Sequence, residues 1–180
     1  MRYIILIYIC SLLSCTPSTK KYDDLIKEYK EFKPSIFNRK SIRLFKKFRK
    51  ISIKEKFSKK QLAEIYHSLG WLAGTIGLNY YNNRGKLRAE LNKVPSGLVK
   101  ATYWTGYSCY YYRRSMNLRS YSSDARKNIT KGNQDERCDK TVPHYLNTHQ
   151  IKLLRGTCKN YSRQKIIPKD GCYYINLVTK

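Results

Sequence analysis

The chain has 180 residues, and its 37 lysines and arginines outnumber 12 aspartates and glutamates, for a formal net charge of +25. This length is typical of one domain with a core of its own. At 41% hydrophobic and 13% aromatic residues, the chain has too many large side chains for a disordered polycation. The glycine-rich nucleotide-binding motifs, H-E-x-x-H and C-x-x-C are all missing from the sequence, which excludes the commonest nucleotide and metal sites at the level of motifs.

An uncharged apolar segment lies close to the N-terminus. It covers residues 4–13 and follows Arg2. The segment is too short to span a bilayer, which needs about 20 apolar residues. Its length fits the apolar part of a secretory signal peptide, with Arg2 as the basic start. A buried N-terminal strand or helix is the alternative, and we expect residues 1–14 to be a signal peptide.

The end of this segment resembles the lipobox of bacterial lipoproteins. In Leu12-Leu13-Ser14-Cys15 an aliphatic residue stands three positions before the cysteine, and a small residue stands directly before it. The resemblance implies cleavage before Cys15 and acylation of Cys15 with chains such as palmitate, which together form a stable membrane anchor. Thr16 stands where an aspartate would signal retention at the inner membrane, so the resemblance implies the outer membrane. Residues 15–21 are then a lipidated tether, and residues 22–180 a single basic domain.

The alternative is a secreted protein without lipid, cleaved shortly after Cys15. Such a chain could carry glycans on the sequons that begin at Asn128 and Asn160. Two sequons are expected by chance at this composition, so they do not distinguish a lipid-anchored protein from a secreted one.

Four cysteines remain once Cys10 is removed with the signal peptide and Cys15 carries lipid. An even number of cysteines in an exported chain predicts disulfides. Zinc ligands usually come in closely spaced pairs, which these widely separated cysteines do not form. We therefore expect no metal site. Of the three possible pairings, short loops favour Cys109–Cys138 together with Cys158–Cys172.

The N-terminal half carries patterns typical of helices. Apolar residues recur every three or four positions in residues 20–33, before Pro34. Residues 39–60 hold eleven lysines and arginines and one acid, Glu55. Their apolar spacing predicts a basic amphipathic helix over residues 41–50, followed by a short extended stretch at residues 51–53.

A capping box predicts the start of the next helix. Ser58 and Gln61 have the required spacing, with Phe57 and Leu62 placed as a hydrophobic staple. One apolar stripe then runs from Leu62 to Tyr80. Three glycines, Gly70, Gly74 and Gly77, flank this stripe and weaken a helix by about 1 kcal/mol each. Either the helix ends near Gly70 or another element packs closely over the glycines, and we expect a break near Gly70. A further helical pattern covers residues 87–94.

The C-terminal half has a different amino-acid composition. Residues 98–112 are rich in aromatic and β-branched side chains, which favours strands. Residues 117–139 are polar and predict a long loop held by Cys138, and residues 171–178 predict a closing strand. The expected fold class is therefore α+β, with a helical N-terminal half and a small disulfide-linked, strand-containing C-terminal half.

Three interpretations of the basic segment 39–60 stay open: a solvated face, contact with anionic lipid, wall polymer or glycosaminoglycan, and contact with nucleic acid. Nucleic acid is the least favoured, because a protein tethered outside the cytoplasm rarely meets chromosomal DNA. The candidate ligand-binding residues are Arg39, Lys40, Arg43, Lys46, Lys47, Arg49 and Lys50, together with Arg113 and Arg114.

An aromatic cluster precedes those two arginines. It comprises Tyr103, Trp104, Tyr107 and Tyr110–Tyr112. Rings beside guanidinium groups can stack on bases or sugars. The other interpretation is a core built from tyrosines and covered by arginine side chains.

Catalysis has one candidate pair, His144 and His149. With nearby lysines, two histidines could supply the acid and base that cleave a phosphodiester. Any pair of histidines in so basic a chain would look the same. We therefore expect a non-enzymatic lipoprotein of the envelope that uses no cofactor and binds an anionic ligand. A secreted ribonuclease-like phosphodiesterase and a purely structural envelope protein are the alternatives.

Overall fold

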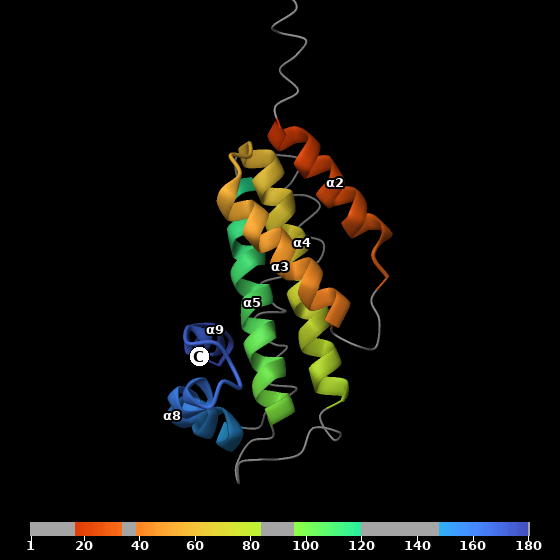
Figure 1. Cartoon of the computed structure of the whole chain (residues 1–180). Coiled ribbons are helices and arrows are strands. Elements are labelled where there is room, and N and C mark those ends of the chain that lie inside the picture. Colours follow the sequence, from red (N-terminus) through yellow and green to blue (C-terminus); the bar gives the residue numbers. More distant parts are fainter. Residues whose placement is uncertain (1–16, 34–38, 84–95, 120–147, 180) are drawn as a thin grey trace, which may run out of the picture.

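A computed structural model describes residues 17–33, 39–83, 96–119 and 148–179, and all secondary structure within these ranges is helical. The expected α+β fold is therefore wrong for this part of the chain (Figure 1). Its helices are α2 (Pro17–Glu31), α3 (Arg39–Lys54), α4 (Lys59–Asn82), α5 (Ser96–Arg119), α8 (Thr148–Arg163) and α9 (Gly171–Val178).

The long antiparallel helices α4 and α5 form the centre of the molecule (Figure 1). Two buried serines of α5 bind backbone carbonyls of α4: Ser108 Oγ donates to Gly70 O at 2.7 Å, and Ser115 Oγ donates to Ala63 O at 2.6 Å. Both pairs are separated by seven residues on each helix, which is the repeat of a packed helix pair. The contact between these helices is thus polar as well as apolar.

The predicted start of α4 is confirmed, but the predicted break is wrong. Ser58 and Gln61 form both hydrogen bonds of the capping box, at 3.2 and 3.1 Å. The helix then continues without interruption past Gly70 to Asn82. The glycines face α5 at close range: a Cβ on Gly70 would lie 2.8 Å from the Tyr112 ring, and one on Gly77 would lie 3.2 Å from Ala101 O. The glycines therefore allow α5 to pack closely on α4, which was the alternative to a break in the helix.

Residues 98–112, expected as strands, lie inside α5. Val99, Tyr103, Tyr107 and Tyr111 recur every four residues and are all buried. Thr102 and Thr105 donate their hydroxyls to carbonyls one turn earlier, Leu98 O at 2.8 Å and Ala101 O at 2.9 Å. These helix-compatible hydrogen bonds let a sequence of β-branched and aromatic residues stay helical, because α5 is packed on several sides.

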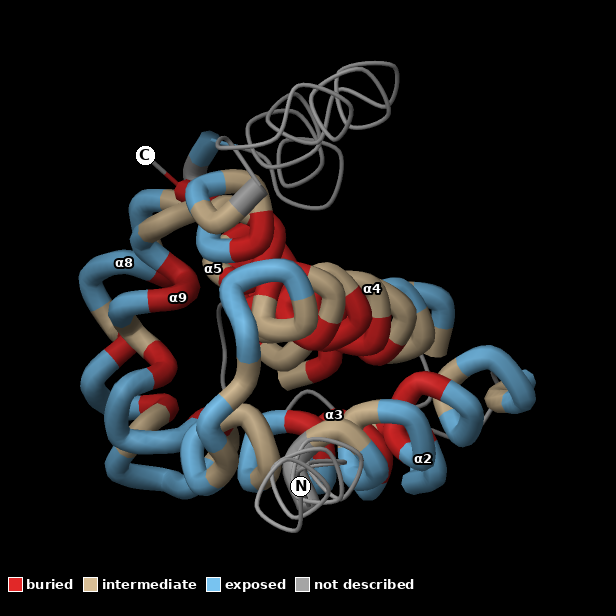
Figure 2. The backbone as a smooth tube through the Cα atoms, turned by 90° about the horizontal axis from the view of Figure 1, so that it is seen from above, coloured by how far each residue is buried: buried red, intermediate tan, exposed pale blue. Residues whose placement is uncertain are grey.

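One side of the central pair is covered by α2 and α3 (Figures 1 and 2). The ring of Phe45 in α3 lies 5.0 Å from Trp104 and 5.4 Å from Tyr107 in α5. Tyr29 of α2 contacts Trp71 at 5.5 Å, between ring centroids. The expected helix over 20–33 is confirmed and begins earlier, at Pro17, so residues 17–21 of the expected tether are helical. The extended stretch at residues 51–53 is wrong, since α3 continues to Lys54.

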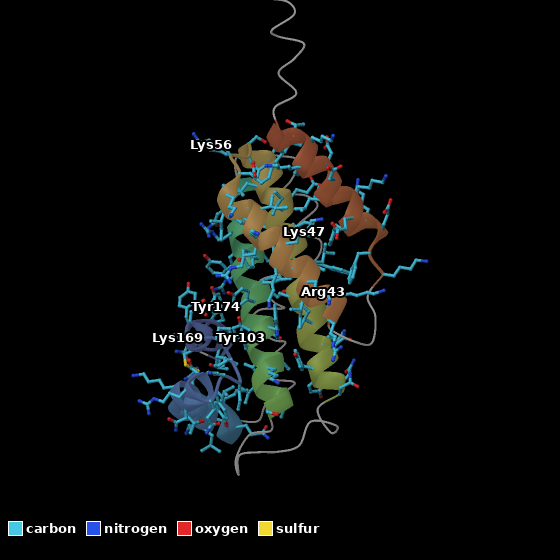
Figure 3. The ribbon with its side chains drawn as sticks, in the orientation of Figure 1. Arg43, Lys47, Lys56, Tyr103, Lys169 and Tyr174 are labelled. Atoms are coloured by element: carbon cyan, nitrogen blue, oxygen red, sulfur yellow. A yellow bond between two sulfur atoms is a disulfide. The ribbon has the colours of Figure 1, made fainter. Side chains whose placement is uncertain are left out.

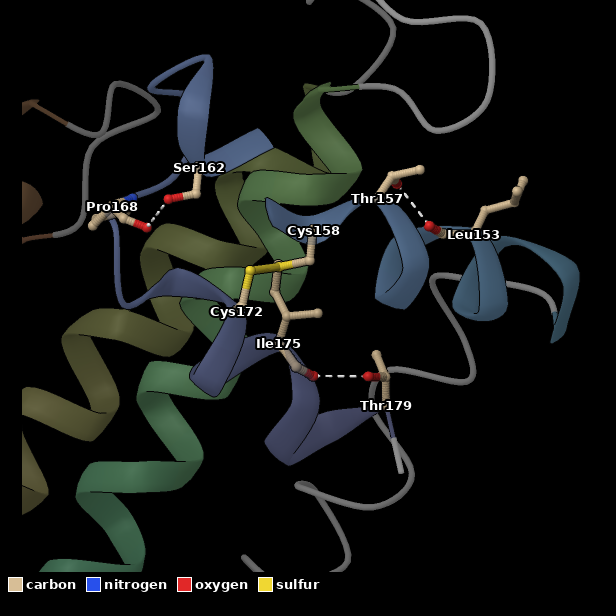
Figure 4. The surroundings of a disulfide bond; sticks show 8 residues. All are labelled: Leu153, Thr157, Cys158, Ser162, Pro168, Cys172, Ile175 and Thr179. Carbon is tan, nitrogen blue, oxygen red and sulfur yellow. Dashed lines mark hydrogen bonds between the residues drawn. A yellow bond between two sulfur atoms is a disulfide. The ribbon is translucent and has the colours of Figure 1, made fainter. Parts of the chain in front are cut away.

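A second side is covered by α9 and α8. The expected closing strand at residues 171–178 is the helix α9, which crosses α5 closely: a Cβ on Gly106 would overlap the carbonyl of Tyr174. Cys158 of α8 and Cys172 of α9 form a disulfide with a Cα–Cα distance of 5.6 Å, so this predicted pairing is confirmed (Figure 4). Cys109 is disulfide-bonded as well, while Cys138 lies outside the described residues.

The end of α8 is a Schellman motif without glycine. Ile166 N donates to Tyr161 O at 3.0 Å and Lys165 N to Ser162 O at 3.1 Å. Lys165, with a φ of 58°, takes the left-handed conformation that glycine usually supplies. The connection to α9 therefore turns sharply and keeps α9 against α5. The helical pattern at residues 87–94 and most of the expected loop 117–139 lie outside the described residues, apart from residues 117–119, which are helical.

Candidate anionic-ligand surface

Helix α3 buries apolar side chains on one face and exposes its basic side chains on the other, apart from Ile53, which is exposed in the last turn. Leu44, Phe45 and Phe48 are buried against the central helices. The opposite face is exposed and consists of eight cations: Arg39, Lys40, Arg43, Lys46, Lys47, Arg49, Lys50 and Lys54. Because the apolar positions follow the period of the helix, burying them turns every cation outward. We call this row the α3 cationic face.

Few carboxylates approach the α3 cationic face in the described part of the chain. Lys47 forms an ion pair with Glu28 of α2 (Figure 3). The other ion pair at this side of the molecule, Lys21–Glu55 at 2.6 Å, uses no residue of the face. α3 itself contains no acidic residue. Most of the positive charge of α3 is therefore open to solvent and to ligands.

Arg49 lies at the edge of the face and contacts the aromatic core. Its guanidinium carbon is 5.8 Å from the centroid of the buried Tyr107 ring. Partial burial lowers its pKa, and nearby Tyr107, Tyr111 and Tyr174 and the Asp170 carboxylate raise it by more, so the net shift is upward. Arg49 thus stays charged while it packs against the core.

Of the two α5 arginines expected to extend this surface, Arg114 contacts tyrosine rings. The Arg114 guanidinium lies 5.0 Å above Tyr66 and 5.4 Å above Tyr110, and it donates a hydrogen bond to Tyr110 Oη at 2.9 Å. Arg113 is half-buried. Arg114 therefore covers tyrosines of α4 and α5, as in the interpretation of a tyrosine core covered by arginine side chains.

Burial supports that core interpretation for the aromatic cluster. Tyr103, Tyr107, Tyr111 and Tyr112 are buried, while Trp104 and Tyr110 are half-buried. The Tyr107 ring lies 3.8 Å from Tyr174 of α9, between centroids. Rings in such contacts hold helices together and do not form an open stacking platform.

The candidate catalytic pair cannot be assembled within the described residues. His144 lies outside them, and His149 is placed in α8 by its backbone only. The lipidation site Cys15 also lies outside them. In the part of the chain that the structure describes, no group of three or more His, Cys, Asp or Glu side chains has an arrangement that could hold a metal ion.

A second basic surface was missed at the sequence level. Lys152, Arg155, Lys159 and Arg163 are exposed along α8, which has no acidic residue. Their spacing of three and four residues would have identified a helical face. Next to it, Arg163, Lys165 and Lys169 line an open hollow of ≈ 480 Å³ at the connection to α9.

The comparisons with known proteins return no match: no family model, no curated protein and no solved structure is significantly similar to this chain. Among the described helices, none has both the length and the apolar composition needed to cross a membrane.

Proposed function

We propose that this protein is an exported bacterial lipoprotein, anchored in the envelope through Cys15, that binds an anionic ligand of the envelope or the host through the α3 cationic face. The observation that carries the proposal is the exposure of all eight cations of a helix whose apolar face is buried. Within the described part of the chain, only Lys47 among them forms an ion pair. A ligand can occupy such a row without unfolding the helix.

The proposed location in the envelope rests on the signal peptide and the lipobox, residues 1–15. Since α2 begins at Pro17, two residues after Cys15, an anchored domain would sit close to its membrane. Anionic headgroups and acidic polymers are concentrated at that surface, where each lysine or arginine adds about 1 kcal/mol of attraction.

Binding to heparin and to vesicles of phosphatidylcholine with phosphatidylglycerol tests the ligand class. The variant Arg43→Gln/Lys46→Gln/Lys50→Gln removes three neighbouring charges from the α3 cationic face. We expect the slope of log affinity against log salt to fall by roughly 0.7–0.9 for each anionic group that the variant no longer neutralises. The full chain is used throughout.

The matched control is Lys152→Gln/Arg155→Gln/Lys159→Gln, which removes the same charge from the exposed face of α8. We expect it to bind nearly as tightly as the unchanged chain. Equal losses of affinity in both variants would mean that only the net charge matters and would refute a site on α3. Intact mass tests the anchor: residues 15–180 plus acyl chains are expected, and an unacylated chain that begins beyond Cys15 would refute it.

A further inference from the structure

One large apolar side chain stands among the lysines at the end of α3. Ile53 is 73% exposed in the last turn of that helix. Lys54, Lys56 and Lys60 follow it in the sequence, across the junction of α3 and α4, and are all exposed. We call these four residues the junction surface. At this exposure Ile53 adds little to the folded core and is free to contact a surface outside the domain.

The start of α2 lies at the same end of the molecule. Lys21 pairs with Glu55 at 2.6 Å, and the Tyr22 ring lies 6.3 Å from Phe57, between centroids. Tyr22 also donates a hydrogen bond to the Glu64 carboxylate of α4. These contacts fix the first turns of α2 beside the junction surface (Figures 1 and 3).

Covalent geometry brings the anchor to this end. Cys15 precedes Pro17 by two residues, which reach at most about 7 Å. An acylated Cys15 would therefore hold this end of the helices, and not the opposite end, at the bilayer. The opposite end of α4 is far away, since Leu78 lies about 28 Å along the helix axis from Lys59.

The charges at this end suit an anionic surface. Within residues 53–60 four lysines accompany a single acid, Glu55, which is paired with Lys21. Asp23 and Asp24 are exposed near the start of α2, where Lys20 and Lys21 precede them in the sequence. Lysines with long apolar stems around an isoleucine are a combination that interfacial segments use, because the chains reach headgroups while the apolar side chain inserts.

We propose that the junction surface rests on an anionic lipid bilayer, with Ile53 inserted among the acyl chains and Lys54, Lys56 and Lys60 bound to headgroup phosphates. This inference rests on the proposed anchor at Cys15 and adds a defined orientation to it. The α3 cationic face would then stand upright from the membrane, open to ligands from the side.

Depth-dependent fluorescence quenching tests the orientation. The acylated full chain is reconstituted into vesicles of brominated phosphatidylcholine with phosphatidylglycerol, as Ile53→Trp and, for a control, Leu78→Trp. Leu78 is also exposed, at 48%, but on the far end of α4. We expect strong quenching at position 53 above the background of Trp71 and Trp104, and none at position 78. Adding Lys54→Gln/Lys56→Gln/Lys60→Gln to Ile53→Trp is expected to reduce the quenching several-fold.

The outcomes separate this inference from the proposed function. An acylated chain without added quenching at position 53, or with equal quenching at both positions, overturns the orientation and leaves the anchor standing. If the quenching at position 53 depends neither on phosphatidylglycerol nor on the three lysine substitutions, the lysines do not bind headgroup phosphates, and that part of the proposal is overturned. A chain that carries no acyl group on Cys15 overturns the anchor and this orientation, and leaves the α3 cationic face to its own test.

Discussion

At the scale of single residues, Gly106 leaves the least room for a side chain among the glycines that the structure describes. A Cβ at this position would lie 3.0 Å from the Tyr174 Cα and would overlap its carbonyl group. Backbone atoms cannot turn aside as a flexible side chain can, so α9 has to move away from α5. The ring of Tyr107, packed on Tyr174, would be separated from its partner at the same time.

We therefore expect Gly106→Ala to lower the free energy of unfolding by about 1–3 kcal/mol or more, measured by urea denaturation. Gly156→Ala is the matched control, because Gly156 is exposed in α8 and a Cβ there would meet no atom within 4 Å. That change should stabilise the helix by up to about 1 kcal/mol. Similar effects of both substitutions would contradict the close crossing of α5 and α9.

Single residues also explain which parts of the candidate site were predictable. Seven of the eight cations of α3 were identified from the sequence, because apolar residues at helical spacing leave the basic ones on the other face. Lys54 was missed, because residues 51–53 were expected to be extended and the helix continues to Lys54. The packing of Arg114 could not be predicted, since its sequence neighbours do not reveal that Tyr66 of α4 lies 5.0 Å from its guanidinium. That contact joins residues 48 positions apart and exists only after α4 and α5 have packed.

At the scale of elements, α8 is held by fewer neighbours than the central helices. It contacts α9, and the disulfide Cys158–Cys172 joins the two (Figure 4). The bridge closes a loop with a sequence separation of 14. A loop of this size restricts the unfolded chain enough to contribute about 3 kcal/mol.

We expect Cys158→Ala/Cys172→Ala to lose about that much stability in urea denaturation. Hydrogen exchange should accelerate in α8 first, while amides of α4 and α5 serve as the internal control and remain protected. Unchanged stability, or equal acceleration in all helices, would contradict a local role for this disulfide.

The helices differ in how well they could be predicted from their sequences. The start of α4 was predicted because a capping box is a local hydrogen-bond pattern that needs no partner. α5 was taken for strands because aromatic and β-branched residues favour strands on average. Its spacing of four residues, from Val99 to Tyr111, was nevertheless visible and indicates a helix.

At the scale of the whole molecule, the buried tyrosines make the free energy of unfolding depend on pH in the alkaline range. Burial raises the pKa of Tyr103, Tyr107, Tyr111 and Tyr174 above the ordinary value of 10.0. As the pH rises through this value, unfolded tyrosines release protons that the folded ones keep. The contribution of these protonated tyrosines to stability is thus complete below pH 10 and is lost above it. The free energy of unfolding therefore falls as the pH increases.

Tyr111→Phe isolates one of these groups, since its shift comes mainly from burial. We expect its free energy of unfolding to fall less steeply above about pH 10 than that of the unchanged chain, by up to about 1.4 kcal/mol per pH unit. Urea denaturation at a series of pH values measures both slopes, and lysine deprotonation affects both chains alike. Parallel slopes would contradict a buried, protonated Tyr111.

Several features of the fold follow from local chemistry alone. These are the amphipathic helices of the N-terminal half, the start of α4, the basic face of α3 and the pairing of Cys158 with Cys172. Each depends on residues close together in the chain, through helix periodicity, capping or a short loop.

The helical state of the described C-terminal segments and the unbroken course of α4 past Gly70 come from the tertiary fold. Both outcomes depend on packing between distant segments, since α5 fills the space over the glycines of α4 and α9 crosses at Gly106. Burial on several sides outweighs the modest strand preference of tyrosine and threonine, which amounts to less than about 1 kcal/mol per residue. That balance cannot be read from neighbouring residues, because the energy that settles it comes from contacts across the fold.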